Sequence, residues 1–190
     1  MSSISRNRRA RVAVWCIGGL LVIGAGVGVR LVGLWLWYGE PYPVADPDRV
    51  AARLEKEAGQ VYDEAALPGP PKASLRAGTS ACDYRGLRSI AHIDQGLGDV
   101  RSFRLSWQMT DVSETAARSA RERTRLRLAR DGWKLSKNIS DEFFRFEQPG
   151  TGDKVDVDWY RPTGTYTVTA YAPCGKVPDV FDENHWPAAR

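Results

Sequence analysis

The heptapeptide KVDVDWY at residues 154–160 has the strongest alternation of polar and apolar residues in the chain. Successive side chains of an extended strand point to opposite faces, so Val155, Val157 and Trp159 share one face. The polar residues between them share the other face. This pattern predicts a half-buried strand in which only one face contacts a core.

The same period of two occurs on both sides of this heptapeptide. Further strands are predicted at residues 101–110, 133–137, 142–148 and 165–172. Between the first two, Asp111 and Glu114 have the spacing of a helix capping box, and Gly132 is a typical residue after a helix end. The order strand, helix, four strands predicts an α+β fold with a mostly antiparallel sheet and one packed helix (β-α-β-β-β-β).

The first forty residues predict a membrane anchor. The stretch 12–29 contains 18 residues without a charge, enough to cross the hydrocarbon core of a bilayer as a helix. Trp35, Trp37 and Tyr38 follow and would form an interfacial aromatic belt. Arg30 would then reach the outer interface with its long side chain.

Arginines before the apolar run set the expected topology. Arg6, Arg8, Arg9 and Arg11 precede it, whereas no basic residue lies between Leu31 and Asp48. The positive-inside rule therefore places the N-terminus in the cytoplasm and the remainder outside, in a single-pass protein of the cell membrane. The alternative is a cleaved signal peptide, although no A-x-A-like cleavage site follows the run.

The domain organisation follows from breaks in these patterns. A helix is expected from Pro47, capped by Asp46, to about Tyr62, because Val50, Leu54, Ala58 and Val61 repeat at helical spacing. The expected parts are a cytoplasmic tail (1–11), a transmembrane helix with aromatic interface (12–38), a juxtamembrane helix with a proline-rich linker (39–78), an extracytoplasmic α+β domain (79–175) and a loose C-terminal tail (176–190).

The charge balance argues against nucleic acid as a partner. The formal net charge is +4, but five of the 27 basic residues lie within residues 6–30. The 22 that remain nearly balance the 23 acidic residues, so the outer part lacks the basic excess that a phosphate backbone requires.

Cys82 and Cys174 are the two cysteines beyond the predicted membrane segment. Outside the cytoplasm the environment is oxidising, so a disulfide between them is predicted. The alternatives are two free thiols or a bridge between chains.

Three arginines at helical spacing are a candidate binding surface. Arg118, Arg121 and Arg125 form one row of the predicted helix. The row would bind an anion or face anionic lipid. The alternative is a solvated helix face whose aliphatic stems cover apolar surface.

Asp156 and Asp158 share one face of the predicted strand. They would serve a cation or acid–base chemistry, or would pair with Arg145 or Lys137 on a neighbouring strand. The second interpretation is favoured. Histidines and cysteines show no metal-ligand spacing, so we expect no metal, no cofactor and no enzymatic activity.

Aromatic residues suggest a protein or glycan partner. Phe143, Tyr160 and Tyr171 fall on the sheet face opposite the core. If nothing covered that face, it would suit a partner surface; the alternative is that the 47–62 helix folds back over it.

The arginine-rich tail, the single span, the segment Cys82–Leu87 and the closing Tyr171–Cys174 together resemble small single-pass membrane proteins of actinobacteria, a class of unassigned function. This resemblance implies no site residues. The leading hypothesis is a non-enzymatic, membrane-anchored binding or interaction domain of the cell envelope. The alternative is an envelope hydrolase or small-ligand-binding protein with a pocket near Asp156, Asp158 and His92.

Overall fold

The computed structural model describes residue 30 and residues 32–67 and 75–187. The predicted membrane segment 12–29 lies outside the described residues. Within the described ranges, no helix combines the length and the apolar character that crossing a bilayer requires. The chain divides into two compact units, Met1–Pro41 with Asp83–Gln95 and Tyr42–Cys82 with Gly96–Arg190. We call the first the helix–loop unit and the second the sheet unit.

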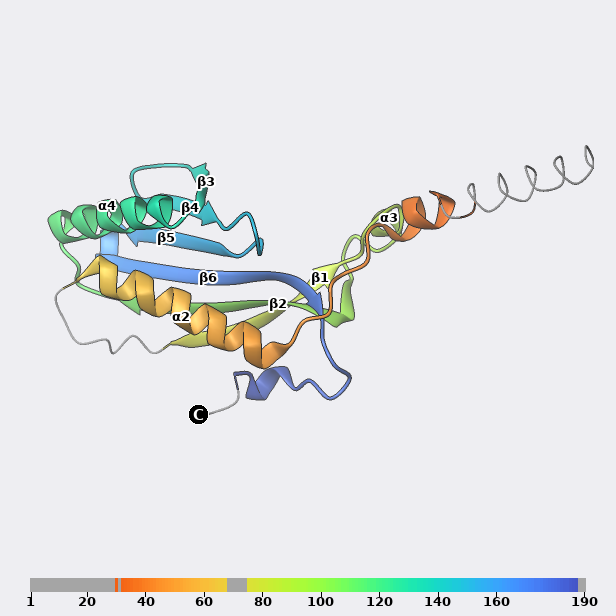
Figure 1. The fold of residues 1–190 in the computed structure, drawn as a ribbon. Helices are drawn as coiled ribbons and strands as arrows, with labels where there is room; N and C mark the ends of the chain where they lie inside the picture. Colours follow the sequence, from red (N-terminus) through yellow and green to blue (C-terminus); the bar gives the residue numbers. More distant parts are fainter. Residues whose placement is uncertain (1–29, 31, 68–74, 188–190) are drawn as a thin grey trace, which may run out of the picture. The chain divides into compact units, whose positions relative to one another are not determined.

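The sheet unit is built on one six-stranded antiparallel sheet with the order β1-β2-β6-β5-β4-β3 (Figure 1). Its strands are β1 (Arg76–Asp83), β2 (Gly96–Met109), β3 (Lys134–Asn138), β4 (Phe143–Glu147), β5 (Lys154–Tyr160) and β6 (Thr165–Lys176). The α+β class is thereby confirmed. The expected order of elements along the chain lacked β1.

The missed strand β1 has a composition that period-two patterns do not detect. It reads RAGTSACD, and among its residues only Cys82 is buried. An edge strand with small, exposed residues has no apolar face to alternate with a polar one. The remaining five strands lie where the alternation predicts them, and β5 has the predicted bounds.

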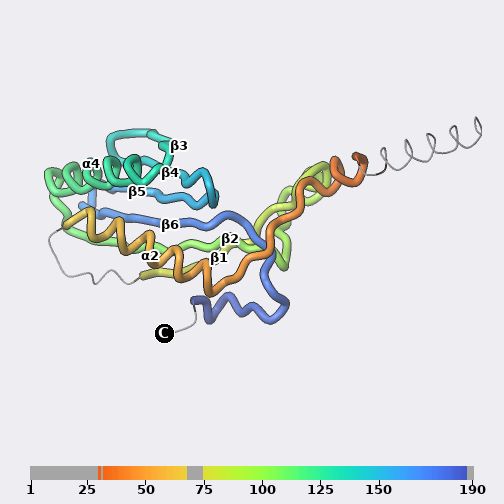
Figure 2. Tube along the Cα trace, in the orientation of Figure 1, coloured from red at the N-terminus to blue at the C-terminus, as the bar shows by residue number. Residues whose placement is uncertain are grey.

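Two helices, rather than the expected one, pack on the sheet. They are α2 (Pro47–Ala65) and α4 (Glu114–Arg130), which contact each other and lie side by side across β2, β6 and the strands beyond (Figures 1 and 2). The face that they cover supplies most of the core, including Phe103, Trp107 and Phe144. The opposite face of the sheet carries no helix among the described residues.

Capping residues explain where both helices begin. Asp46 accepts hydrogen bonds from the backbone N–H groups of Asp48 and Arg49, as predicted for α2. In α4 the cap is Ser113, whose Oγ accepts from the N–H of Ala116. The predicted role of Asp111 as the cap was wrong, because Asp111 has a φ of 58° and belongs to the preceding turn.

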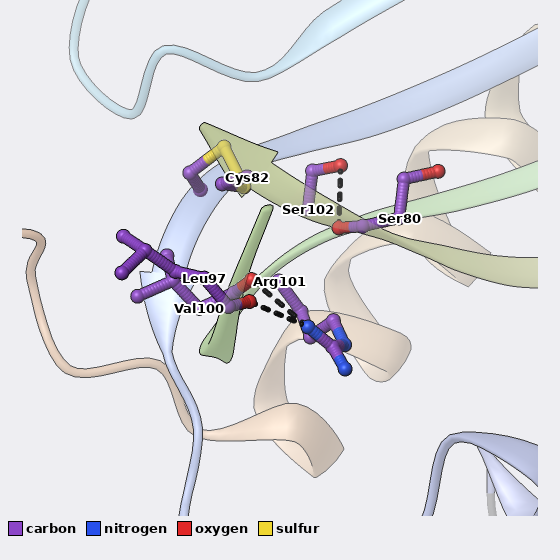
Figure 3. Close-up of a disulfide and its surroundings, with 7 residues drawn as sticks. Ser80, Cys82, Leu97, Val100, Arg101 and Ser102 are labelled. Atoms are coloured by element: carbon purple, nitrogen blue, oxygen red, sulfur yellow. Dashed lines mark hydrogen bonds between the residues drawn. A yellow bond between two sulfur atoms is a disulfide. The ribbon is translucent and has the colours of Figure 1, made fainter. Parts of the chain in front are cut away.

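The predicted disulfide is present. Cys82 in β1 and Cys174 in β6 are bonded, with their Cα atoms 6.2 Å apart. Both strands pair with β2, so the bridge joins the two neighbours of that strand (Figure 3). Close by, Ser102 Oγ donates to the Ser80 carbonyl, which adds a polar link between β2 and β1.

The C-terminal segment is packed, which differs from the expected loose tail. Trp186 is buried, contacts Phe103, and donates from its Nε1 to the Pro47 carbonyl at 3.0 Å. Phe181 also contacts the ring of Phe103. Two short 3₁₀ helices complete the sheet unit: η1 (Arg161–Thr163) and η2 (Glu183–His185).

The helix–loop unit consists of the helical residues 32–38 and the segment 83–95, which contains α3 (Arg88–Ala91). The segment 83–95 is an excursion between β1 and β2. Leu87 N–H donates to the Leu36 carbonyl at 2.9 Å, which ties the excursion to the helical residues.

Candidate functional site

A cavity of about 410 Å³ lies beside α4, and we call it the arginine cavity. This volume is within the range of small-ligand sites. Its lining combines four guanidinium groups, three carboxylates and one indole: Glu114, Arg118, Arg121, Glu122, Arg125, Asp141, Trp159 and Arg161. All three arginines of the predicted row therefore line one cavity.

Helix periodicity explains why Arg118, Arg121 and Arg125 line the cavity together. Arg118, Arg121 and Arg125 are spaced by three and four residues, so they share a face of α4. Arg123 lies on a neighbouring face of α4, and its guanidinium donates to the carbonyls of Glu64 and Ala65 at the end of α2. Arg123 thus links α4 to the end of α2, whereas Arg118, Arg121 and Arg125 line the cavity.

Arg121 is the most unusual residue of the site. It is only 9 % exposed, and its Nε has no hydrogen-bond acceptor among the described residues. The guanidinium lies 5.5 Å from the centre of the Phe144 ring, a cation–π contact that does not use its N–H groups. Burial lowers the pKa of Arg121 below its ordinary value. The charge of Arg125 also lowers it, whereas Tyr166, Asp141 and Glu142 oppose the shift. An arginine nevertheless stays charged at neutral pH, so this cation has one buried N–H, at Nε, without a bound acceptor.

Trp159 adds a second donor without an acceptor. It is 5 % exposed, and its Nε1 is buried with no hydrogen-bond partner in the described part of the chain. An unpaired buried donor costs free energy of about 1–3 kcal/mol. Both of these donors belong to residues that line the arginine cavity.

Two arginines of the cavity, Arg118 and Arg161, form ion pairs with carboxylates. Arg118 binds Glu114 at 2.9 Å, and Arg161 lies 3.1 Å from a carboxylate oxygen of Glu142. Among the described residues, no carboxylate forms an ion pair with Arg121 or Arg125. Over the whole lining, four arginines face three carboxylates, so the cavity keeps a net charge of +1, which favours an anionic ligand.

A second cavity, of about 330 Å³, lies between α2 and α4, and we call it the Glu57 cavity. Its lining includes charged side chains, amides and one indole: Arg53, Lys56, Glu57, Gln60, Arg127, Asp131, Trp133 and Gln148, with Val61, Leu128, Thr151 and Val155. Burial, followed by the charge of Asp153, raises the pKa of Glu57 to about 7, although Arg53 and Lys56 oppose the shift. Glu57 Oε2 is buried and has no hydrogen-bond donor among the described residues.

Asp153 is the buried neighbour of this cavity. It is fully buried, and Arg53 Nη2 donates to its Oδ1 at 3.0 Å. Arg53 Nε lies 2.8 Å from Oδ2, an ion-pair contact without hydrogen-bond geometry. The pair links α2 to the turn between β4 and β5.

Replacing Glu57 by glutamine (Glu57→Gln) is expected to change the pH dependence of stability. The pKa of this carboxyl is near its ordinary value of 4.5 in the unfolded chain and about 7 in the folded protein, so between these values the folded state binds more protons. The free energy of unfolding of the wild type therefore falls as the pH rises through this window. The variant lacks this fall. It should match the wild type at pH 4.5 and exceed it by about 1–2 kcal/mol at pH 8, once partial exposure is allowed for.

Urea unfolding at several pH values measures this effect. Asp63→Asn, which changes an exposed carboxylate on the same helix, is the matched control and should keep the pH dependence of the wild type. An unchanged slope between pH 4.5 and 8 in Glu57→Gln would contradict the assignment.

The paired aspartates on the open sheet face are in different environments. Asp156 binds Arg145 through both carboxylate oxygens, with Arg145 directly opposite in the β4–β5 register. This is one of the two partners that the hairpin predicted. Burial raises the pKa of Asp158, and the charge of Glu142 raises it further. No cluster of metal-ligating side chains occurs in the described ranges.

His92 belongs to the helix–loop unit. It stacks on Tyr84 at 4.2 Å between ring centres, and its Nδ1 lies 2.9 Å from Gln95 Oε1. Neither the arginine cavity nor the Glu57 cavity is lined by His92, Asp156 or Asp158.

The three residues of the predicted aromatic face are exposed or half-buried and lie at two separate places on the sheet. Phe143 lies opposite Asp158 in the register, whereas Tyr171 lies opposite Lys154. Tyr160 is six residues along β5 from Lys154, a separation of about 20 Å. The Arg145–Asp156 pair lies between these ends, so the three aromatic side chains do not form one cluster.

Sequence patterns missed several residues of both cavities. Trp159 and Arg161 reach the arginine cavity from β5 and the turn after it, far from α4 in sequence. Glu57 did leave a signal, because it lies three residues after Leu54 and four before Val61 on the buried stripe of α2. A carboxylate beside such a stripe is a candidate for an altered pKa.

Comparison of the chain with protein-family models, with curated proteins and with solved structures gives no match. Function is therefore argued from the geometry of the cavities.

Proposed function

We propose that this protein is a single-pass, membrane-anchored protein whose extracytoplasmic domain binds an anionic component of the cell envelope in the arginine cavity. The observation that carries the proposal is the buried Nε of Arg121, which has no acceptor among the described residues. A phosphate or carboxylate group would supply that acceptor. Arg125 and the Trp159 indole, which line the same cavity, would assist.

The compartment and topology are proposed on other grounds. The arginines at residues 6–11 and the apolar run 12–29 support a span with a cytoplasmic N-terminus. The Cys82–Cys174 bridge is compatible with an oxidising environment outside the cytoplasm. The basic excess lies before the sheet unit, which argues against a nucleic-acid partner.

A hydrolase or small-ligand pocket near Asp156 and Asp158 has less support. Both carboxylate oxygens of Asp156 bind Arg145, so this carboxylate is not available as a base or a metal ligand without breaking the pair. We therefore propose binding rather than catalysis.

Calorimetric titration tests the anion site. The full-length chain in nanodiscs of phosphatidylcholine is titrated with inorganic phosphate, and we expect saturable binding. Arg121→Gln should weaken it about 10- to 100-fold, as expected for the loss of a charge-assisted hydrogen bond of about 1.5–3 kcal/mol. Arg125→Gln should weaken it as well.

One control variant and one change of lipid accompany the titration. Arg130→Gln changes an exposed arginine of the same helix and should bind as the wild type does. Nanodiscs containing phosphatidylglycerol compete with phosphate only if a lipid headgroup reaches the cavity. Phosphate affinity that is the same in the wild type, Arg121→Gln and Arg125→Gln, or no binding in either lipid, would refute the proposal.

A further inference from the structure

Backbone contacts make the helix–loop unit a defined local structure. Leu87 N–H donates to the Leu36 carbonyl, and Arg85 Nη1 donates to the Glu40 carbonyl at 3.0 Å. Gly39 and Gly86 pack against each other with φ values of 70° and 63°. A Cβ at Gly86 would lie 2.4 Å from Gly39 N, so this approach requires glycine. The excursion 83–95 is thereby held against the helical residues 32–38.

Apolar side chains of this unit are exposed. Leu87, Ile90 and Ile93 of the excursion are 50 %, 69 % and 75 % exposed. The helical residues add exposed side chains at Val32, Leu34, Trp35, Leu36, Trp37 and Tyr38. None of the described residues in this unit is buried. Single exposed apolar residues are ordinary, but here two connected segments expose them and bury none.

The chemistry of these side chains fits one occupant, the interfacial layer of a lipid bilayer. Tryptophan and tyrosine favour the level of the headgroups, and isoleucine and leucine favour the acyl chains below. The apolar run 12–29 leads directly into this helical segment in the sequence, so a membrane that holds the run lies next to the unit. Burying each of the three aliphatic side chains would contribute roughly 1.5–3 kcal/mol.

Arg88 suits the same layer. Its guanidinium lies 5.1 Å from the Tyr38 ring centre and 4.7 Å from that of Tyr84. An arginine held between two tyrosines can reach lipid phosphates while its stem stays among apolar groups.

We propose that the excursion 83–95 inserts Leu87, Ile90 and Ile93 into the outer interface of the membrane that holds residues 12–29. The inference rests on the proposed span and adds a second, monotopic attachment to it. The two attachments fix the orientation of the helix–loop unit on the bilayer.

Environment-sensitive fluorescence at single cysteines tests this insertion in the full-length chain. In a Cys16→Ser background, Ile90→Cys and Ile93→Cys are labelled with a nitrobenzoxadiazole dye and reconstituted into phosphatidylcholine and phosphatidylglycerol vesicles. The disulfide-bonded cysteines do not react. Both labels should emit at shorter wavelength than in water. Nitroxide-bearing lipids should quench them several-fold more than a label at Ile139→Cys. Ile139 is the matched control, because it is an isoleucine of the sheet unit with 72 % exposure.

The wild-type Cys16, labelled in a separate sample, separates failure of this inference from failure of the span. Quenching at Cys16 with water-like emission at residues 90 and 93 would overturn the insertion and leave the span intact. Water-like emission at all three would overturn both. Quenching at 90 and 93 but not at Cys16 would support the contact and remove the span. Equal quenching at 90, 93 and 139 would also contradict the insertion.

Discussion

Removing the disulfide through Cys82→Ala together with Cys174→Ala is expected to lower the free energy of unfolding by about 4–5 kcal/mol. The two cysteines are 92 residues apart in sequence, so the bridge constrains a long loop of the unfolded chain. Such a loss is a large part of the stability of an ordinary domain. Urea unfolding of the full-length chain in detergent measures it.

The effect should begin at β1. Apart from Cys82, the residues of this strand are not buried, so apolar packing does little to keep it on the sheet. Hydrogen exchange in the double variant should therefore rise first in β1. Cys16→Ala, which changes a cysteine outside the bridge, is the control and should unfold as the wild type does. A loss below about 1 kcal/mol would contradict the expectation.

Trp107→Ala is the second change with a large expected effect, a loss of about 3–5 kcal/mol. Trp107 is 2 % exposed and lies between Tyr62 and Tyr166, whose ring centres are 5.2 Å and 5.8 Å away. Its Nε1 donates to the Ala58 carbonyl at 3.1 Å. The side chain therefore joins β2 to α2 and to β6, and truncation leaves a cavity among all three.

Two further variants separate the causes. Trp107→Phe keeps a ring but removes the donor, and it should cost clearly less than alanine. Trp35→Ala changes a tryptophan that is 62 % exposed and should leave the thermal unfolding of the sheet unit unchanged. If Trp107→Ala and Trp35→Ala had equal effects, Trp107 would not hold α2 on the sheet.

Local patterns predicted the parts of the fold whose residues carry their own signal. Strand β5 was found with its bounds because Val155, Val157 and Trp159 alternate with charges. Strand β1 was missed because Gly78, Ser80 and Ala81 give no alternation of polarity. The packing of Trp186 on Phe103 joins residues 83 apart and follows from no local period.

The sequence likewise predicts some features of the arginine cavity and not others. Helical spacing alone predicts that Arg118, Arg121 and Arg125 share one face of a helix. It did not show that Arg121 would be buried without an acceptor, because that depends on Phe144 and Trp159 from other strands. The Arg53–Asp153 pair likewise joins residues 100 apart, so only the folded chain brings these charges together.

Where the chain enters the sheet unit also determines how that unit would respond to tension. The Pro43 carbonyl accepts from the Lys176 N–H at 2.7 Å, and the Ala45 N–H donates to the Lys176 carbonyl at 2.8 Å. In a tethered chain, a pull from the N-terminal side reaches these two bonds before it reaches α2. Lys176 follows Cys174 by two residues, so these two bonds lie next to the covalent crosslink between β6 and β1.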